Sequence, residues 1–209
     1  MGGESFFARG STVLSPMKQL LFLEGSGAGF LAFDIETYSP KGFPHLMEDP
    51  VVNFSLVTLL KQRGVLAISF LAEPYLEGGT LRLLKCLLSV FKGFCLLTYN
   101  GSKFDLEYVH HRGRFYNIDF DGVFSEIEHF DVYKAVREAF WLPNYGQKSV
   151  ERFLGIKRVV NDVNGANYHL VFDEFALNWS LKPMFYNIED SFGCLRIANN
   201  VLNRLKHAS

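Results

Sequence analysis

The sequence predicts an α/β fold in which one mixed five-stranded sheet carries helices on both faces. Strand-like apolar runs come first, helical spacing appears later, and no linker, internal repeat or low-complexity run divides the 209 residues. Antiparallel strands need only tight links, whereas parallel strands need crossovers, so three strands followed by alternating helices and strands indicate a mixed sheet. We expect an N-terminal tail over 1–15 and a single domain over 16–209.

The first three strands are predicted from their apolar content. Residues 29–36 (GFLAFDIE) form an apolar run that ends on two acids, which is typical of a buried central strand. Residues 51–60 and 64–72 are rich in β-branched and aromatic residues and flank a polar link over 61–64 that contains glycine. Two such runs on either side of a short link predict a hairpin.

The later elements follow from helical spacing and from two further short apolar runs. Leucines at positions 81, 84, 87 and 88 mark one face of a helix over 80–91, which Gly93 ends. Residues 94–99 and 129–133 are strand candidates, and a helix is expected from about 103 to 112 between them. Short helices are expected over 134–140 and 147–154, and a long one over 183–206 with Pro183 in its first turn.

Composition and charge exclude several classes of protein. The net charge of −1 argues against a protein that coats duplex DNA, although it allows an enzyme that holds a few nucleotides at a chain end. Cys86, Cys95 and Cys194 are odd in number and widely spaced, so we expect reduced core residues rather than disulfides or a zinc site. Because the sequence lacks a secretion signal and an apolar run of membrane length, we expect a cytoplasmic protein without membrane contact.

The first acidic motif lies at the end of the first strand. Asp34 and Glu36 are two residues apart, so their side chains point to the same side of the strand. Two neighbouring carboxylates repel each other unless a cation lies between them, and hard oxygen ligands favour Mg²⁺ or Mn²⁺. The alternative is a solvated strand end.

The second acidic motif follows the strand over 94–99. The chain turns over Asn100 and Gly101, and Asp105 opens a helix beside Phe104. An aromatic ring at this place could stack on a terminal base, whereas core packing is the alternative for Phe104. A favourable position in the helix dipole is the alternative explanation for Asp105.

The third acidic motif belongs to the last helix. Tyr186 and Asp190 are four residues apart, so they share one helix face and project together. A buried tyrosine that only packs is the alternative. Glu189 lies on a different face, and we expect it to be solvated. Asp131, inside a strand candidate, is expected to have a structural or supporting role.

Two groups of basic residues are candidates for phosphate contacts. One follows the second motif and the other lies near the short helix over 147–154, and for both the alternative is a solvated helix end. The first group comprises Lys103, His110, His111, Arg112 and Arg114, and the second comprises Lys148, Arg152, Lys157 and Arg158.

In this order the three acidic motifs resemble those of DEDDy-type 3′–5′ exonucleases, which have a ribonuclease H-like fold. The resemblance is strongest to the proofreading domain of family B DNA polymerases, and it covers residues 28–204. Its motifs match residues 33–37, residues 99–105 with the following helix, and the Tyr186–Asp190 pair, while segments 129–133 and 149–155 resemble connecting segments of that domain. Residues 156–182 depart from the pattern. Since no polymerase region follows, we expect the exonuclease module to stand alone.

The resemblance implies a mechanism and a set of functional residues. It assigns Asp34, Glu36, Asp105 and Asp190 as ligands of two divalent metal ions, Mg²⁺ or Mn²⁺, and Tyr186 as the residue that orients the attacking water. It also implies substrate contacts by Thr37, Asn100 and Phe104, to which Lys103 and Arg112 of the basic cluster are added.

The substrate implied by the resemblance is a nucleic-acid 3′ end, cut to nucleoside 5′-monophosphates. Single-stranded or frayed DNA is favoured, because a splayed end enters a site more easily than a duplex interior. RNA as substrate, an endonuclease, and a catalytically silent binding module for nucleic acid or protein are the alternatives. The sequence leaves open whether the chain forms homo-oligomers, and in which pathway or with which partner proteins it acts.

Overall fold

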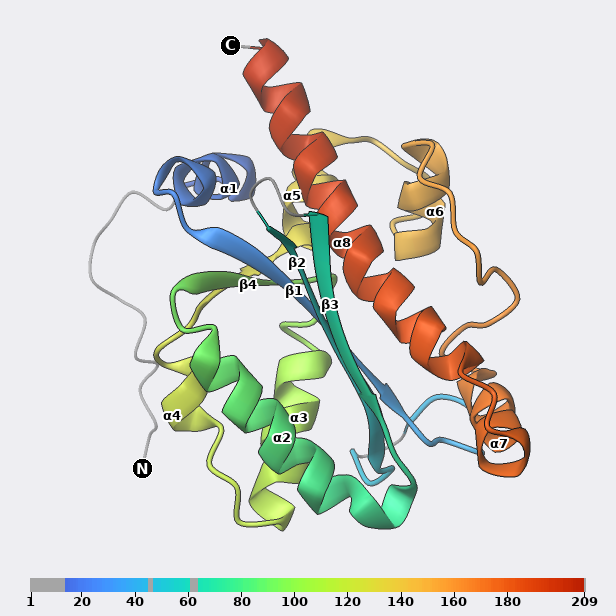
Figure 1. The fold of residues 1–209 in the computed structure, drawn as a ribbon. Helices are drawn as coiled ribbons and strands as arrows, with labels where there is room; N and C mark the ends of the chain where they lie inside the picture. Colours follow the sequence, from blue (N-terminus) through green and yellow to red (C-terminus); the bar gives the residue numbers. More distant parts are fainter. Residues whose placement is uncertain (1–13, 45–46, 61–63, 209) are drawn as a thin grey trace, which may run out of the picture.

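A computed structural model describes residues 14–44, 47–60 and 64–208. Its centre is a five-stranded sheet with the strand order β3-β2-β1-β4-β5 (Figure 1). β1 (Gly29–Thr37) pairs antiparallel with β2 (Val51–Leu60), which pairs antiparallel with β3 (Gly64–Leu71). On its other side β1 pairs parallel with β4 (Phe94–Thr98), and β4 pairs parallel with β5 (Glu128–Asp131). The predicted mixed sheet is therefore confirmed.

Helices cover both faces of this sheet (Figure 1). One face packs against α1 (Pro16–Gly25), α5 (Val132–Ala139), α6 (Gln147–Phe153) and α8 (Lys182–Ala208). The other face packs against α2 (Glu77–Val90), α3 (Asp105–Phe115) and α4 (Asp121–Phe124). A 3₁₀ turn (Pro74–Leu76) precedes α2, and α7 (Tyr168–Asn178) packs beside β1 and α8. The expected arrangement of helices on both faces is thus confirmed.

The alternation of side chains along β1 decides which face carries the first acidic motif. Leu31 and Phe33 enter the apolar cluster under α2 and α3, whereas Ala32 enters the cluster under α8. Because successive side chains of a strand point to opposite faces, Asp34 and Glu36 continue the row of Ala32. Both acids therefore lie on the face that α8 covers.

Buried polar groups of β2 hold α8 over this face. Asn53 and Ser55 are the register partners of Glu36 and Asp34, and both are fully buried. The Asn53 side-chain amide donates to the Pro183 carbonyl at 3.2 Å, and the Ser55 hydroxyl donates to the Asn187 carbonyl at 2.9 Å. Since a buried polar group without a partner is costly, these bonds fix the position of α8 along the sheet.

The predicted elements agree with the structure to within a few residues, and three helices were not predicted. The unpredicted helices are α1, α4 and α7, of which α7 occupies part of the segment 156–182. The hairpin of β2 and β3 is confirmed by the pairing of Leu60 with Gly64, although its predicted link over 61–63 lies outside the described residues, as does most of the predicted N-terminal tail.

All three cysteines are free thiols, as predicted, but the prediction that all are core residues is wrong for one of them. Cys95 and Cys194 are buried, whereas Cys86 is exposed on α2. The leucine face of α2 turns toward the sheet, so Cys86, which lies off that face, is left in solvent.

Within the part of the chain that the structure describes, no helix has the length and apolar character that crossing a membrane requires.

Candidate active site

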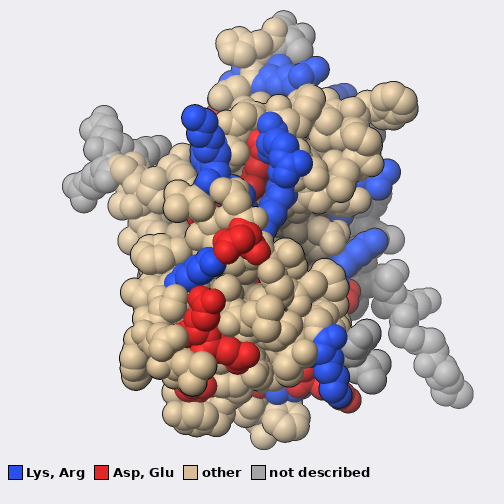
Figure 2. Space-filling model, turned by 90° about the vertical axis from the view of Figure 1, so that its right-hand side faces the viewer, with Lys and Arg blue, Asp and Glu red and all other residues tan. Residues whose placement is uncertain are grey.

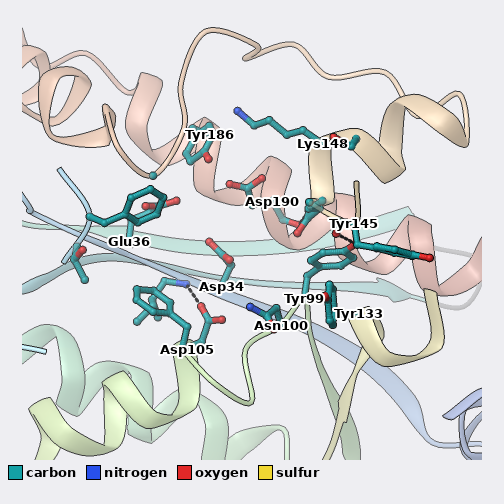
Figure 3. A pocket seen from close by; sticks show the side chains of 18 of the residues that line it. Asp34, Glu36, Tyr99, Asn100, Asp105, Tyr133, Tyr145, Lys148, Tyr186 and Asp190 are labelled. Carbon is teal, nitrogen blue, oxygen red and sulfur yellow. Dashed lines mark hydrogen bonds between the residues drawn. The ribbon is translucent and has the colours of Figure 1, made fainter. Parts of the chain in front are cut away.

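Three carboxylates from two distant parts of the chain meet over the sheet. One oxygen from each of Asp34, Glu36 and Asp190 lies within 4.8 Å of the other two (Figure 3). β1 supplies the first two and α8 supplies the third, so the long helix completes the cluster. These distances allow one cation to contact all three side chains.

Asp105 lies beside this group at the start of α3. Its Oδ1 accepts a hydrogen bond from the backbone N–H of Ile35 at 3.2 Å, and its side chain is buried. This bond directs the Asp105 carboxylate toward β1, because Ile35 is the residue between the two acids of the first motif. In Figure 3 Asp105 points toward Asp34 from the opposite side to Asp190.

Burial and mutual repulsion work against the ionised forms of these acids. Burial raises the pKa of Asp34 and Glu36 well above its usual range, and the charges of Asp105 and Asp190 raise it further. Burial also raises the pKa of Asp105 to about 7, although the bond from Ile35 opposes this rise. A divalent cation would relieve the repulsion, and carboxylate oxygens are the ligands that Mg²⁺ and Mn²⁺ prefer. The residues present therefore fit a metal ion.

Tyr186 lies one turn before Asp190 on α8, with its hydroxyl near the Asp190 carboxylate. The ring is 4% exposed and packs against Tyr168. Burial, followed by the charge of Asp190, raises the pKa of the Tyr186 phenol, so the group keeps its proton and acts as a donor. The predicted shared face of Tyr186 and Asp190 is observed.

Two cations lie among the acids. Arg158 Nη1 is 2.7 Å from Asp190 Oδ1 and 3.0 Å from Glu151 Oε2, and its side chain is 6% exposed. Lys148 lines the pocket, donates to the Val163 carbonyl and places its Nζ 4.8 Å from the centre of the Tyr186 ring.

The remaining basic candidates do not reach the pocket. Arg152, Lys157, His111 and Arg114 are exposed, and none of these described residues lines the pocket. His110 and Arg114 instead form ion pairs with Asp121, so the basic cluster after the second motif is largely a solvated helix surface.

The acids open into a cavity of about 870 Å³. Thr37, Asn100 and Phe104, three of the five predicted substrate contacts, line it together with the four acids and Tyr186. Phe104 also packs on Tyr108, so both of its predicted roles have a physical basis.

The other two predicted substrate contacts lie elsewhere. Lys103 is exposed and is absent from the described lining. Arg112 is buried: its guanidinium donates to both carboxylate oxygens of Glu77 and to the Glu48 carbonyl. Buried Glu77 needs a counter-ion, and Arg112 supplies it, so the structure corrects the prediction that Arg112 contacts substrate.

Asp131 fixes the turn that carries the second motif. Its carboxylate accepts from the Asn100 backbone N–H at 2.7 Å and from the Ser102 hydroxyl at 2.6 Å. Asn100 has a left-handed backbone with φ of 64°, and the next position has no room for a side chain: a Cβ on Gly101 would lie 2.6 Å from Asp105 Oδ2. The supporting role expected of Asp131 is observed.

Several residues of the site were not singled out from the sequence. Asn187 donates to Asp34 Oδ2 at 2.6 Å, and Glu189 accepts from the backbone N–H groups of Val159 and Val160, so Glu189 is not simply solvated as expected. Asn187 lies within the third motif. Its position relative to the helix residues that face the sheet is the feature of the sequence from which its contact with the site could have been predicted. Tyr133 and Tyr145 also line the cavity, but their positions between the motifs carry no comparable signal.

The family model for the RNase H superfamily matches residues 31–201, which include all four acids and Tyr186. The chain belongs to the RNase H superfamily. A solved structure of the family B DNA polymerase from the hyperthermophilic archaeon Pyrobaculum calidifontis is similar to this superfamily member, with a TM-score of 0.67 and 21% identity. The match covers 84% of this chain and 24% of the polymerase chain, so the chain corresponds to about a quarter of that protein. No curated protein matches the sequence.

Membership of the RNase H superfamily and the carboxylate cluster agree with each other. The polymerase is too distant in sequence to show more than the fold, but the superfamily domain spans most of the chain. A nuclease-type fold with a buried acidic cluster compatible with divalent metal is therefore established. The expected resemblance is confirmed at this level.

Proposed function

We propose that the protein is a metal-dependent 3′–5′ exonuclease that releases nucleoside 5′-monophosphates from single-stranded or frayed DNA. The observation that carries the proposal is the convergence of Asp34, Glu36, Asp105 and Asp190 with Tyr186 in one cavity. These residues come from β1, α3 and α8, and any other function has to explain why the fold brings them together at the cost of mutual repulsion.

The acids would hold two divalent ions, Mg²⁺ or Mn²⁺. Asp34, Glu36 and Asp190 form the closer group, and Asp105 would share the second ion with Asp34. When bound, such ions increase the nucleophilicity of water and stabilise charge on the departing oxygen. Asn187 and the Ile35 N–H hold two of the acids in place, so the site needs little rearrangement on binding.

The neighbouring side chains would orient the reactants. The protonated hydroxyl of Tyr186 is close enough to Asp190 to hydrogen-bond a water beside it and direct that water at the phosphate. Asn100 and Phe104 would contact the terminal nucleotide from one wall, and Thr37 from the strand that carries the acids. Lys148, which also lines the cavity, is the cation available to a phosphate oxygen.

The surface charge favours recognition of a strand end over binding along a duplex. On the face drawn in Figure 2, acidic and basic side chains are interspersed and several lie next to one another, so the basic side chains form no continuous surface there. A protein that follows the duplex backbone needs a continuous basic surface. The cavity instead concentrates its contacts at one point.

A degradation assay tests the proposal. The protein is incubated with single-stranded DNA and RNA of identical sequence, with Mg²⁺, Mn²⁺ or neither. A 5′ label reports the length of the remaining strand, and a label in the 3′-terminal nucleotide reports released mononucleotide on thin-layer chromatography. We expect stepwise shortening from the 3′ end of DNA, mononucleotide release, no reaction without metal, and survival of a circular single strand. Faster digestion of RNA would change the substrate, and cutting of the circle would indicate an endonuclease.

Asp34→Asn supplies the decisive control. It removes one ligand charge without changing the size of the side chain, so degradation should fall to background while the melting temperature stays the same or rises. Asp121→Asn is the matched control, since Asp121 is on the surface of α4 and should leave degradation unchanged. If the wild type releases no mononucleotide with any metal, the protein is a binding module.

A further inference from the structure

Three tyrosines form one end of the cavity. Tyr99 follows β4, Tyr133 lies in α5 and Tyr145 lies between α5 and α6, and all three line the cavity. The ring centres of Tyr99 and Tyr133 are 5.9 Å apart, and those of Tyr133 and Tyr145 are 6.3 Å apart. In Figure 3 this tyrosine wall lies on one side of Asp34, whereas Glu36 and Tyr186 lie on the other. The cavity therefore continues past the acids in the direction of the wall.

Hydrogen bonds hold the wall in place. The Tyr99 hydroxyl donates to the Tyr145 carbonyl at 2.6 Å, and the Tyr145 hydroxyl donates to the Phe140 carbonyl at 3.0 Å. The hydroxyls are thus used within the protein, and the rings are left to face the cavity. A fixed aromatic ring loses little conformational entropy when a planar group stacks on it.

An arginine without an acidic partner accompanies the wall. Arg137 is exposed on α5, and its guanidinium carbon lies 5.0 Å from the ring centre of Tyr145 and 5.8 Å from that of Tyr133. Its Nη1 donates to the Tyr133 hydroxyl at 3.2 Å, and among the described residues it forms no ion pair. Four of its five N–H donors remain available to a ligand.

We infer that Tyr133, Tyr145 and Arg137 form a binding subsite for the nucleotides on the 5′ side of the scissile phosphate in a single-stranded polynucleotide. The inference rests on the proposed function, which places the scissile phosphate at the acids and the terminal nucleotide against Thr37 and Phe104. The rest of the strand then has to leave the cavity by another route, and the tyrosine wall borders the cavity beyond Asp34.

The chemistry of the wall suits this occupant. Aromatic rings stack on any base, so the subsite would bind a strand without reading its sequence. A guanidinium recognises phosphate through paired N–H donors. A metal ion would not bind here, because the wall contains no carboxylate and its hydroxyls already form hydrogen bonds within the protein.

A comparison of two substrates tests the subsite. Arg137→Ala and the matched variant Lys134→Ala remove one exposed cation each from α5. Neither side chain belongs to the described lining of the cavity, but Arg137 lies over the rings of Tyr133 and Tyr145, which do line it. For a single-stranded DNA oligonucleotide we expect Arg137→Ala to raise KM about five- to tenfold with little change in kcat. For the p-nitrophenyl ester of thymidine 5′-monophosphate, which has no nucleotide upstream, both variants should match the wild type.

Three further measurements sharpen the comparison. Losing one phosphate contact should reduce the slope of log KM against log salt by about 0.7 for Arg137→Ala only. Tyr133→Phe keeps the ring and should retain most of the affinity, whereas Tyr133→Leu should raise KM for the oligonucleotide but not for the ester. A parallel RNA oligonucleotide shows whether the subsite distinguishes the two sugars, and stacking alone predicts the same ratio for both.

The outcomes separate this inference from the proposed function. Equal KM for wild type and Arg137→Ala on the oligonucleotide, or the same increase on the ester, would overturn the subsite. If the wild type cleaves neither substrate, the proposed function fails, and the subsite is then tested by anisotropy of a fluorescent single-stranded oligonucleotide in Ca²⁺. Weaker binding by Arg137→Ala than by Lys134→Ala would still support the subsite, and equal binding would remove it.

Discussion

Three of the four acids have a partner that fixes their direction. Asn187 donates to Asp34, the Ile35 N–H donates to Asp105, and Arg158 pairs with Asp190. Such contacts hold ligand atoms in place before a cation arrives, which raises metal affinity because less freedom is lost on binding. The precision of the site thus depends on neighbours of the acids, of which Ile35 and Asn187 lie within the motifs and Arg158 lies outside them.

Tyr186→Phe separates the hydroxyl of Tyr186 from its ring. The ring packs against Tyr168 and will keep its place, but the hydroxyl that would hydrogen-bond a water beside Asp190 is lost. We expect turnover to fall by roughly 10²-fold while metal affinity stays within a factor of a few. Single-turnover rates and calorimetric metal titration measure the two quantities, and an unchanged rate would remove Tyr186 from the mechanism.

Arg158→Ala tests the buried cation. Removal leaves Glu151, which is 1% exposed, without its counter-ion, and breaking a buried pair in this way costs about 3–5 kcal/mol. We expect a lower free energy of unfolding in urea and reduced turnover because Asp190 loses its partner. Arg152→Ala, on the exposed side of α6, is the matched control and should unfold like the wild type. Equal stability of the two variants would contradict the role of Arg158.

At the scale of elements, α6 and α8 approach closely through Gly193. A Cβ at this position would overlap Glu151 Oε1 and lie 2.9 Å from Gln147 Nε2. A flexible side chain could move away, but Glu151 is held by Arg158 and Gln147 in a buried position. The packing of α6 against α8 at Gly193 therefore depends on the position of Glu151. Glu151 forms an ion pair with Arg158, which also pairs with Asp190.

Gly193→Ala should destabilise the protein despite the higher helix propensity of alanine. Overpacking of this kind costs about 1–3 kcal/mol, more than the roughly 1 kcal/mol that alanine contributes in a helix. Gly79→Ala in α2 is the control, because a Cβ there meets nothing within 4 Å, and it should stabilise the protein. Opposite shifts in melting temperature are expected, and a stabilised Gly193→Ala variant would show that Glu151 is free to move.

The sequence predicted those elements whose pattern is local. In β1 and α2 the pattern of apolar residues is visible within the element itself. In contrast, α1 is held by the burial of Leu20 and Leu23 against distant helices. The helix α7 depends on Tyr168 and Phe172, which pack against β2 and Tyr186 from far along the chain. Contacts of this kind leave no periodic signal, so both helices were missed.

The candidate site divides in the same way. The acids and Tyr186 were found because their order along the chain resembles a known arrangement. Arg112 was misjudged because its partner, Glu77, is 35 residues away, and no local spacing reports that pairing. The tyrosine wall was overlooked because only Tyr99 belongs to a motif, whereas Tyr133 and Tyr145 come from segments between the motifs.

At the scale of the whole molecule, the acidic cluster couples folding to pH and to metal. The pKa of Asp105 is about 7 in the folded protein and 3.8 in the unfolded chain, so the folded state binds the proton more tightly. Without metal this stabilising effect is complete below pH 3.8 and is lost as the pH rises through 7. At alkaline pH the repulsion is therefore fully present unless a cation relieves it.

Asp105→Asn should consequently be more stable than the wild type at pH 8 in the presence of a chelator. Asparagine can still accept from the Ile35 N–H but carries no charge, so we expect an advantage on the order of 3 kcal/mol, or several degrees in melting temperature. The advantage should shrink at pH 5 and when Mg²⁺ is added, while nuclease activity is lost. Thermal unfolding of both proteins at pH 8 and at pH 5, each with a chelator or with Mg²⁺, measures the difference in stability. A stability advantage independent of pH would exclude the charge of Asp105 as its cause.

The position of α8 in the chain has a consequence for biosynthesis. Asp34 and Glu36 are made early, and Asp105 follows, but Tyr186 and Asp190 belong to the helix that comes after every other described element. During translation the earlier strands and helices emerge from the ribosome while this helix is still being made. A nascent chain therefore lacks a complete cluster of acids, and the messenger RNA and other nucleic acids around the ribosome meet no finished site until α8 has docked on the sheet.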